Sequence, residues 1–437
     1  MTALYNENPF AKKFGRTGIG SVIFAILLLL PILSSTYLAQ ELSGRRIPIA
    51  IISILICAPF AIRELGFSIR VGLWSLPFIM GAIVASTMNP DYIQSNMRQI
   101  LYHISLVLCA IPGFIFVKFL HERNINPATY IAVILTLLYL YGVYTYFAQV
   151  YRLPIFLNFL RMNPISGLGE IRYYSGWSSG ARAYSVWFEP SYAAAILPLS
   201  LAILPMINSN TIKNYLMVSM IGFVVLTFSR SAWMVLAMMS LVGSVGLFSD
   251  RSPLKVTLFS IYIFLIAAIL TFVVQHALDL MVPELSSRIR ASSNLQAIQE
   301  IIESSFLGTG TPDLIGYSGF RFGVVSFILT HIHNSILSYT HWMGFFGLLF
   351  CLLPLIQLLK AGSRLPRPYS VSVIIFSYGM LACITWGGDL INLTGVWFSI
   401  GFIWGILRLV EHRRIDRNPP PSGRRGRIQI ISEDPIQ

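Results

Sequence analysis

ATYIAVILTLLYLYGVYTYFAQ, residues Ala128–Gln149, contains no charged side chain. A helix of this length rises about 33 Å, which matches the hydrocarbon core of a bilayer, about 30 Å thick. Similar apolar runs recur along the whole chain. Of its 437 residues, 55% are hydrophobic and 11% are charged, whereas a soluble domain carries about 25% charged residues. The sequence therefore predicts an all-α polytopic membrane protein.

About twelve transmembrane helices are predicted, so both chain termini lie on one side of the bilayer. Their approximate bounds are 18–39, 47–62, 71–88, 99–119, 128–149, 191–208, 212–228, 231–249, 254–276, 334–359, 370–386 and 390–410. The first run is too long for a signal peptide and lacks a small-residue cleavage site, so we interpret it as a span. We expect three parts: a cytoplasmic segment 1–17, one membrane domain 18–410 and a disordered basic tail 411–437.

Lysine and arginine are distributed unequally between the two sides. Twenty of the 31 lie on the side of the termini and eleven on the other, so the positive-inside rule assigns both termini to the cytoplasm. All six lysines fall inside, and every outside cation is arginine. The planar fork of arginine suits phosphate groups, although the general excess of arginine explains part of this bias. No basic stretch interleaved with aromatic residues indicates nucleic-acid binding.

Two outer connections are long enough to carry function, because loops above about 15 residues are usually functional or disordered. They span about 151–190 and 278–333, and both contain aromatic and apolar residues, which argues against disorder. In the second, Ser292–Ser305 has its apolar residues at helical spacing, which predicts an amphipathic helix on the surface or over a cavity. A turn is expected at Leu307–Gly310.

The chain shows no pattern typical of a metal or redox site. Each cysteine falls inside an apolar run without a CxxC pair, so the cysteines are interpreted as buried small hydrophobes. They are Cys57, Cys109, Cys351 and Cys383. His331 and His333 are separated by one residue and would point apart on a helix, and no HExxH motif occurs. We expect no metal site and no cofactor.

Four polar motifs lie on the predicted outer side, and the first is Arg182–Ser191 (RAYSVWFEPS). Pro190 suits the start of a helix, and Glu189 lies at the mouth of that helix, where the dipole favours a carboxylate. Simpler structural roles stay open: Glu189 as a helix cap and Arg182 as a snorkelling side chain. The second motif is Thr227–Trp233 (TFSRSAW). Its turn is so tight that Arg230 must sit at the membrane interface, where a plain anchoring role is the alternative.

The third and fourth motifs flank the second long loop. Arg288 and Arg290 precede the amphipathic segment and the glycine turn, and arginines with glycine-rich backbone suit a diphosphate. A solvated start to a surface helix is the alternative. The fourth motif is His331–Ser335 (HIHNS), followed by Gly344 and Gly347. Arginine and histidine collected on one face of the bilayer indicate the handling of a phosphate-bearing lipid.

In this order, the motifs resemble those of the O-antigen ligase and polysaccharide polymerase superfamily of bacterial membrane glycosyltransferases. The matching residues are Arg182, Phe188–Ser191, Ser229–Ser231, Arg288, the glycine turn, His333–Ser335, Gly344 and Gly347. The resemblance covers roughly 180–350 by motif and the flanking spans by topology. It implies a GT-C-like helical fold in the bacterial inner membrane. It also implies metal-independent transfer of a saccharide from undecaprenyl diphosphate on the periplasmic face.

The resemblance also suggests roles for individual residues. His333 would be the base that takes the proton of the acceptor hydroxyl, since histidine has an ordinary pKa of about 6.5, and Glu189 is the rival base. Four arginines would stabilise the diphosphate leaving group: Arg182, Arg230, Arg288 and Arg290. Three residues are expected to contact sugar, although tyrosine and tryptophan also gather at membrane interfaces: Tyr184, Trp187 and Asn334.

Polymerase is the first expectation and ligase the alternative. Family polymerases transfer the glycan to another lipid-linked repeat unit, and ligases transfer it to lipid A core. Phe188–Ser191 looks more like the polymerases. Trp342 departs from the family, which often has an acidic residue two positions before the glycine, and the doublet Arg288/Arg290 leaves the third arginine open. The partners implied are the lipid-linked donor, the acceptor glycan or lipid A core, and a chain-length regulator.

A flippase or transporter of the same lipid-linked sugar is the rival class of protein. Such a protein should carry charges inside its spans, along a path across the membrane. Here the predicted spans are nearly free of charge, and the cations stop at one face. A receptor or assembly protein without catalysis is the third reading, and it needs no cluster of Arg and His at one depth.

Overall fold

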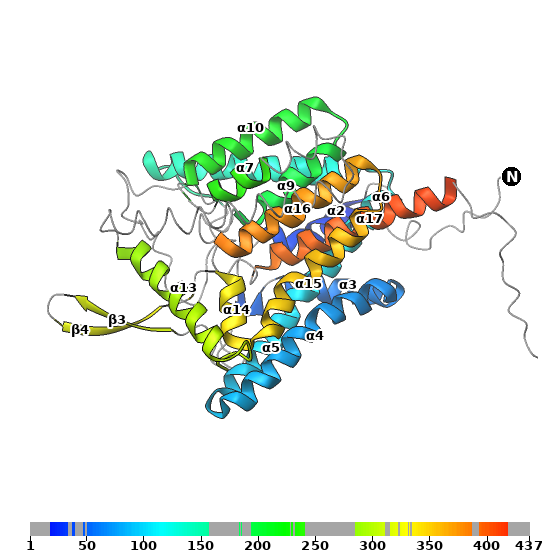
Figure 1. Ribbon diagram of the computed structural model, residues 1–437. Helices are drawn as coiled ribbons and strands as arrows, with labels where there is room; N and C mark the ends of the chain where they lie inside the picture. The colour runs from blue at the N-terminus through cyan, green and yellow to red at the C-terminus, as the bar shows by residue number, and fades with distance from the viewer. Residues whose placement is uncertain are drawn as a thin grey trace, which may run out of the picture.

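Helices form most of the chain and pack lengthwise into a bundle (Figure 1). The computed structural model describes residues 18–33, 37–39, 47–48, 50–156, 183, 185, 194–227, 229, 232–240, 285–310, 315–321, 324–330, 332, 334–386 and 393–417. The helices up to the first long loop are α2 (Ile19–Leu33), α3 (Ile51–Arg63), α4 (Leu65–Met88), η1 (Pro90–Tyr92), α5 (Ile93–Leu108), α6 (Ala110–Glu122) and α7 (Pro127–Val150).

The second half of the bundle follows the first long loop. Its helices are α9 (Leu197–Ile203), η3 (Leu204–Met206), α10 (Asn210–Thr227), α13 (Leu285–Glu303), α14 (Ser335–Met343), α15 (Phe345–Gly362), α16 (Arg367–Trp386) and α17 (Thr394–Arg417). A further helical segment covers 232–240. α17 continues to Arg417, so the helix extends seven residues past the predicted boundary at 410.

Six segments of the described chain are long and apolar enough to cross a membrane. They are Leu65–Met88, Gln99–Glu122, Pro127–Val150, Phe345–Gly362, Arg367–Thr385 and Thr394–Glu411. Each coincides with a predicted span, and three shorter apolar helices (Ile19–Leu33, Ile51–Arg63 and Leu197–Met206) fall on others. The chain is therefore helical, with several segments suited to a membrane, and the count of twelve stays a prediction.

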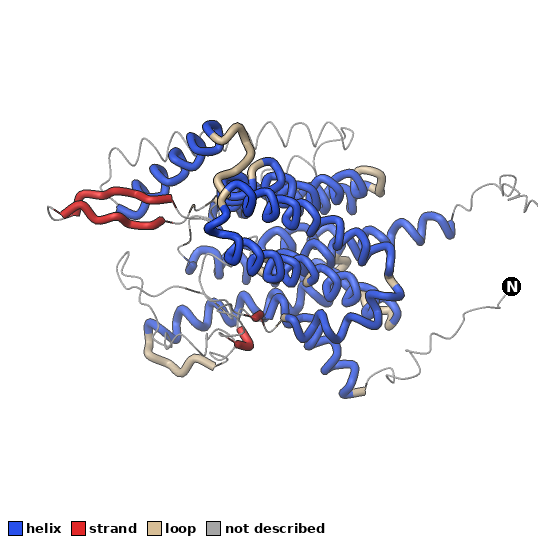
Figure 2. The backbone as a smooth tube through the Cα atoms, turned by 90° about the horizontal axis from the view of Figure 1, so that it is seen from below, coloured by secondary structure: helices blue, strands red, loops and turns tan. Residues whose placement is uncertain are grey.

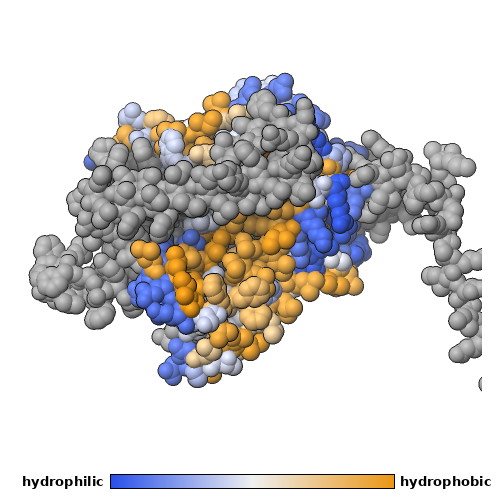
Figure 3. Space-filling model, viewed as in Figure 1, coloured by the Kyte–Doolittle hydropathy of each residue, from blue (hydrophilic) through white to orange (hydrophobic). Residues whose placement is uncertain are grey.

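The outer face of α4 shows why a bilayer suits this bundle. Large apolar side chains at helical spacing point away from the protein, at Ile69, Leu73, Leu76, Met80 and Ile83, each at least 42% exposed. Figure 3 shows a broad hydrophobic zone with hydrophilic residues at both of its ends. Such an apolar patch is costly in water but neutral against lipid chains.

The centre of the bundle is held by close approach of backbones. α17 lies against α6, where a side chain at Gly401 would overlap the carbonyl oxygen of Ala110. A side chain at Gly113 would likewise overlap the carbonyl oxygen of Phe398. Small residues at a helix crossing let dispersion contacts and backbones approach closely, and this supplies packing energy inside a membrane. The four cysteines are buried, as predicted.

The loops gather at two opposite ends of the bundle. One end, here called the pocket end, holds the α6–α7 turn, the start of α10 after Met206, and the start of α16 at Tyr369, because these segments line one cavity. α4, α7, α10 and α15 reach the other end, here called the loop end, on the left of Figure 1. The predicted sides of the loops agree with this division: connections predicted inside lie at the pocket end.

Two antiparallel hairpins accompany the helices. β1 (Tyr37–Ala39) pairs with β2 (Ile47–Pro48), and β3 (Ile315–Arg321) pairs with β4 (Val324–Thr330). The second hairpin belongs to the second long loop and projects from the bundle (Figure 2). The sequence analysis did not predict it, because loop length and composition alone do not identify a strand pair.

Candidate functional site

Most of the predicted site residues lie outside the described part of the chain. These are Arg182, Tyr184, Trp187, Glu189, Arg230 and His333. Arg288 and Arg290 lie on the described backbone of α13, and Asn334 is described with its side chain. Neighbouring residues that are described still show how the four motifs are anchored at the loop end.

Asn334 caps the helix that follows the histidine motif. Its backbone is extended (φ −145°, ψ 111°), and its side-chain oxygen accepts a hydrogen bond from the N–H of Leu337 at 3.1 Å. The Asn334 carbonyl accepts from the N–H of Ser338 at 2.8 Å. An asparagine at this position satisfies a helix N–H that would otherwise lack a partner. The cap therefore occupies the amide oxygen, and the predicted sugar contact is left to the amide NH₂ group.

Asn334→Ala is expected to lower the free energy of unfolding by about 0.5–2 kcal/mol, as loss of an N-cap does. Asn334→Ser keeps a capping oxygen but loses the amide, so it tests sugar contact separately from helix capping. Asn126→Ala is the matched control, because Asn126 caps α7 at the pocket end by accepting from Ala128 N–H at 2.9 Å. Thermal unfolding and glycan transfer are measured for each variant. Equal transfer rates for Asn334→Ser and the wild type would remove Asn334 from the sugar site.

α13 packs along α14 and carries the two arginines of the third motif. Ala297 and Ile332 are buried together against Leu337. Further along both helices, Glu300 Oε2 lies 2.5 Å from Nε2 of the buried His341. Because both contacts advance in the same chain direction, α13 and α14 run side by side in parallel.

Helix periodicity separates the two arginines. Position 290 is seven residues, two turns, before Ala297 and lies on the same face of α13. Position 288 is nine residues before Ala297, a rotation of about 180°, and lies on the opposite face. The register therefore puts Arg290, rather than Arg288, on the side of α13 that meets α14. The sequence analysis had left this choice open.

The predicted amphipathic helix is confirmed, but it begins at Leu285 and its buried face differs from the expected one. Small or middle-sized residues at Ser293, Ala297 and Ile301 are buried, whereas Leu295 and Ile302 are 42% and 62% exposed. α13 therefore presents apolar side chains outward as well as inward. This arrangement suits a helix between a bundle and lipid.

The glycine turn has a structural role. Gly308 and Gly310 have φ of +88° and +75°, which favours glycine. The N–H groups of Thr309 and Gly310 donate to the carbonyls of His341 and Trp342 at 2.8 and 3.1 Å. The expectation that this backbone contacts a diphosphate is wrong for these two N–H groups, because they bind the end of α14.

The first two motifs adjoin each other. The N–H of Ala183, next to Arg182, donates to the carbonyl of Leu226 at 2.9 Å. Leu226 lies in the last turn of α10, four residues before Arg230. The buried Ser229 accepts from the N–H of Ala232 at 3.4 Å, which is a capping contact for 232–240.

The same segment is also held from below by α7. The buried hydroxyl of Ser185 donates to the carbonyl of Leu138 at 2.7 Å, so the backbone around Ser185 meets the middle of that helix. Two motifs separated by about forty residues in sequence thus share one anchoring place. Sequence spacing alone did not indicate this contact.

The departure at Trp342 has a structural explanation. Its indole N–H donates to Oδ1 of the buried Asn96 at 3.0 Å, and the Asn96 amide donates to the carbonyl of Gly310 at 3.4 Å. The tryptophan therefore ties α14 to α5 and to the glycine turn. The sequence analysis missed Asn96, although a polar residue just before a predicted span was the available signal.

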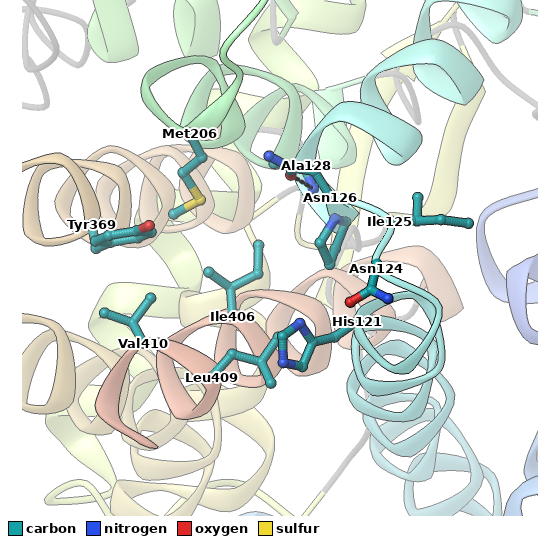
Figure 4. A pocket seen from close by; sticks show the side chains of 11 residues that line it. His121, Asn124, Ile125, Asn126, Ala128, Met206, Tyr369, Ile406, Leu409 and Val410 are labelled. Carbon is teal, nitrogen blue, oxygen red and sulfur yellow. Dashed lines mark hydrogen bonds between the residues drawn. The ribbon is translucent and has the colours of Figure 1, made fainter. Parts of the chain in front are cut away.

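A cavity of about 300 Å³ lies at the pocket end. Figure 4 shows His121, Asn124 and Asn126 along one wall, with Tyr369 opposite and Ile406 between them. None of the predicted site residues lines it. It is about 25 Å from the loop end, since twenty helical residues of α10 separate Met206 from Leu226.

The motifs at the loop end and the cavity at the pocket end are thus separate features. The comparisons with known proteins add no name to either: no family model matches the chain, and no curated protein is significantly similar to it.

Proposed function

We propose that this protein is a polysaccharide polymerase of the inner membrane. It would transfer a glycan from undecaprenyl diphosphate to the hydroxyl of another lipid-linked repeat unit on the periplasmic face. One observation carries the proposal: motifs far apart in sequence are anchored to each other at the loop end. Ala183 binds Leu226, and α13 lies against the segment that leads into α14.

The reaction needs one base and a cationic group for the leaving diphosphate. The anomeric C1–O bond to the diphosphate breaks while C1 bonds to the acceptor oxygen, and the acceptor proton passes to His333. Undecaprenyl diphosphate leaves with the electron pair of the broken bond. Arg182, Arg230 and Arg290 would stabilise the negative charge on the bridging oxygen.

Glu189 remains the rival base, and it is tested by the same assay. The helix register favours Arg290 over Arg288 as the third arginine, because position 290 shares the face of α13 that meets α14. A single line of three arginines and a histidine would need no metal ion to neutralise the diphosphate.

The distribution of charge supports one-sided chemistry over transport. Within the six candidate spans, the charged side chains lie within six residues of one helix end. They are Arg70, Lys118, Glu122, Lys360, Arg367, Arg408 and Glu411. All seven lie toward the pocket end, so the middles of these spans offer no charged path. A flippase of lipid-linked sugars would need such a path.

Purified protein in lipid nanodiscs, supplied with an undecaprenyl-diphosphate oligosaccharide and a chelator of divalent metals, is expected to produce a ladder of longer lipid-linked glycans. The products are resolved by gel electrophoresis and mass spectrometry. No ladder, but transfer after lipid A core is added, would instead make the protein an O-antigen ligase. No product with either acceptor would contradict both glycosyltransferase proposals and favour the transporter.

A further inference from the structure

An imidazole is enclosed by aromatic rings inside the bundle. His103 of α5 is 3% exposed, and its ring stacks on Phe78 of α4 with centroids 4.0 Å apart and planes 17° apart. Tyr339 and Trp342 of α14 and Phe350 of α15 surround it edge-on. A phenyl ring would fill this space without the cost of burying two polar nitrogens.

The hydrogen bonds determine the tautomer of this histidine. Nδ1 lies 2.8 Å from the carbonyl oxygen of Gln99, and a carbonyl only accepts, so Nδ1 carries the proton. In the neutral ring Nε2 is then an acceptor, and the hydroxyl of Tyr339 donates to it at 2.5 Å. Both nitrogens are satisfied, which is what makes a polar group tolerable at this depth.

The partner of His103 lies on the helix that follows the histidine motif. α14 is only nine residues long, begins after Asn334 and ends at Gly344, whose φ is +61°. Two helical turns of this length do not hold their place by length alone. Side chains of Tyr339, His341 and Trp342 bind α5 and α13 instead.

We propose that His103 is a positioning residue for the candidate site. Its bond to Tyr339 holds the height and rotation of α14 relative to α5, and α14 in turn holds the segment His333–Asn334 beside α13. Tyr339 lies five residues, about 7.5 Å along the axis, from Asn334. The catalytic part of this inference rests on the proposed function, whereas the structural part does not.

Three variants separate positioning from stability: His103→Phe, Tyr339→Phe and the double variant. Each single change leaves a buried polar atom unpaired, so the Tm should fall. In the double variant both partners are apolar, and the Tm is expected to recover toward the wild type. The hydrogen bond that orients α14 is still missing there, so kcat should stay about 10-fold low, with KM within about twofold. Recovery of kcat together with the Tm in the double variant would overturn the positioning role.

A matched pair elsewhere in the bundle is the control. The indole N–H of the buried Trp74 on α4 donates to Gln357 Oε1 on α15 at 3.0 Å, and neither residue contacts α14 through this bond. Trp74→Phe with Gln357→Leu removes a buried helix-to-helix hydrogen bond of the same kind. Its kcat should match the wild type. A loss as large as that of the His103 series would mean that any such bond is needed, which contradicts a specific role for His103.

Amide hydrogen exchange at Leu337 supplies a readout that needs no substrate. Its N–H is held by the Asn334 cap, so displacement of α14 should speed its exchange in His103→Phe and in the double variant, but not in the Trp74/Gln357 control. If the wild type transfers no glycan to either acceptor, the proposed function fails while this measurement still tests the positioning. Unchanged exchange at Leu337 would overturn the positioning role even if the wild type is an active transferase.

Discussion

His333→Ala is expected to abolish measurable glycan transfer while the protein still inserts into the membrane and purifies as a folded bundle. General-base catalysis typically contributes about 10²–10⁴-fold to a rate, and an acceptor hydroxyl is a weak nucleophile until its proton is taken. The loss should fall on kcat, because the base acts in the transition state and adds little to substrate binding. The measurement is ladder formation by the purified variant in nanodiscs, with size-exclusion chromatography as the test of folding.

Two other histidines serve as controls for this experiment. His121→Ala changes the pocket end and should leave the rate of transfer unchanged. His341→Ala removes the partner of Glu300 and should lower stability, with activity lost only as far as α13 detaches from α14. Full activity of His333→Ala would end its assignment as base, and Glu189→Gln would then be the deciding variant.

Gly401→Ala is expected to cause the largest loss of stability of any single methyl group added to the bundle core. The new Cβ would overlap the carbonyl oxygen of Ala110, which belongs to the backbone of α6 and has no flexible end to move aside. Overpacking usually costs about 1–3 kcal/mol, and a clash between two helix backbones should reach or exceed about 3 kcal/mol. Since a native protein is stable by about 5–15 kcal/mol, most of the population should lose its fold or aggregate on extraction.

Gly222→Ala is the matched control for this substitution. Gly222 also lies within a helix, α10, but no described atom lies within 4 Å of an added Cβ. The change there should be neutral or stabilising by up to about 1 kcal/mol, because alanine favours a helix over glycine. Thermal unfolding in detergent compares the two variants. Equal melting temperatures would show that α6 and α17 can separate without cost, which would contradict the close helix crossing.

Several helices could be predicted from local sequence because their signals are local. The run Ala128–Gln149 became α7, and 370–386 became most of α16, since length and hydropathy are enough to identify such segments. The amphipathic pattern after residue 292 also predicted α13, although its first seven residues were missed. Those residues, Leu285–Ala291, carry two arginines and little apolar periodicity, so their helical state depends on their neighbours.

The candidate site was less predictable than the helices. Asn334 was expected to bind sugar, and its oxygen caps α14 instead, because an asparagine before a helix serves its own backbone first. The glycine turn was expected to face a diphosphate, and its N–H groups bind the end of α14. In both cases the chemistry of the residue was read correctly, but its partner came from a segment that the sequence did not identify.

The sequence by itself determined that the chain is helical, that several of its helices suit a membrane, and how its loops divide between the two ends of the bundle. Hydropathy, length and the placement of cations are properties of single segments, so they need no knowledge of packing. Only the tertiary structure decided that position 290, rather than 288, lies on the face of α13 toward α14. It alone also paired His103 with Tyr339, 236 residues away. Such pairings depend on the rotation and height of one helix against another, and those are set by the packing of the whole bundle.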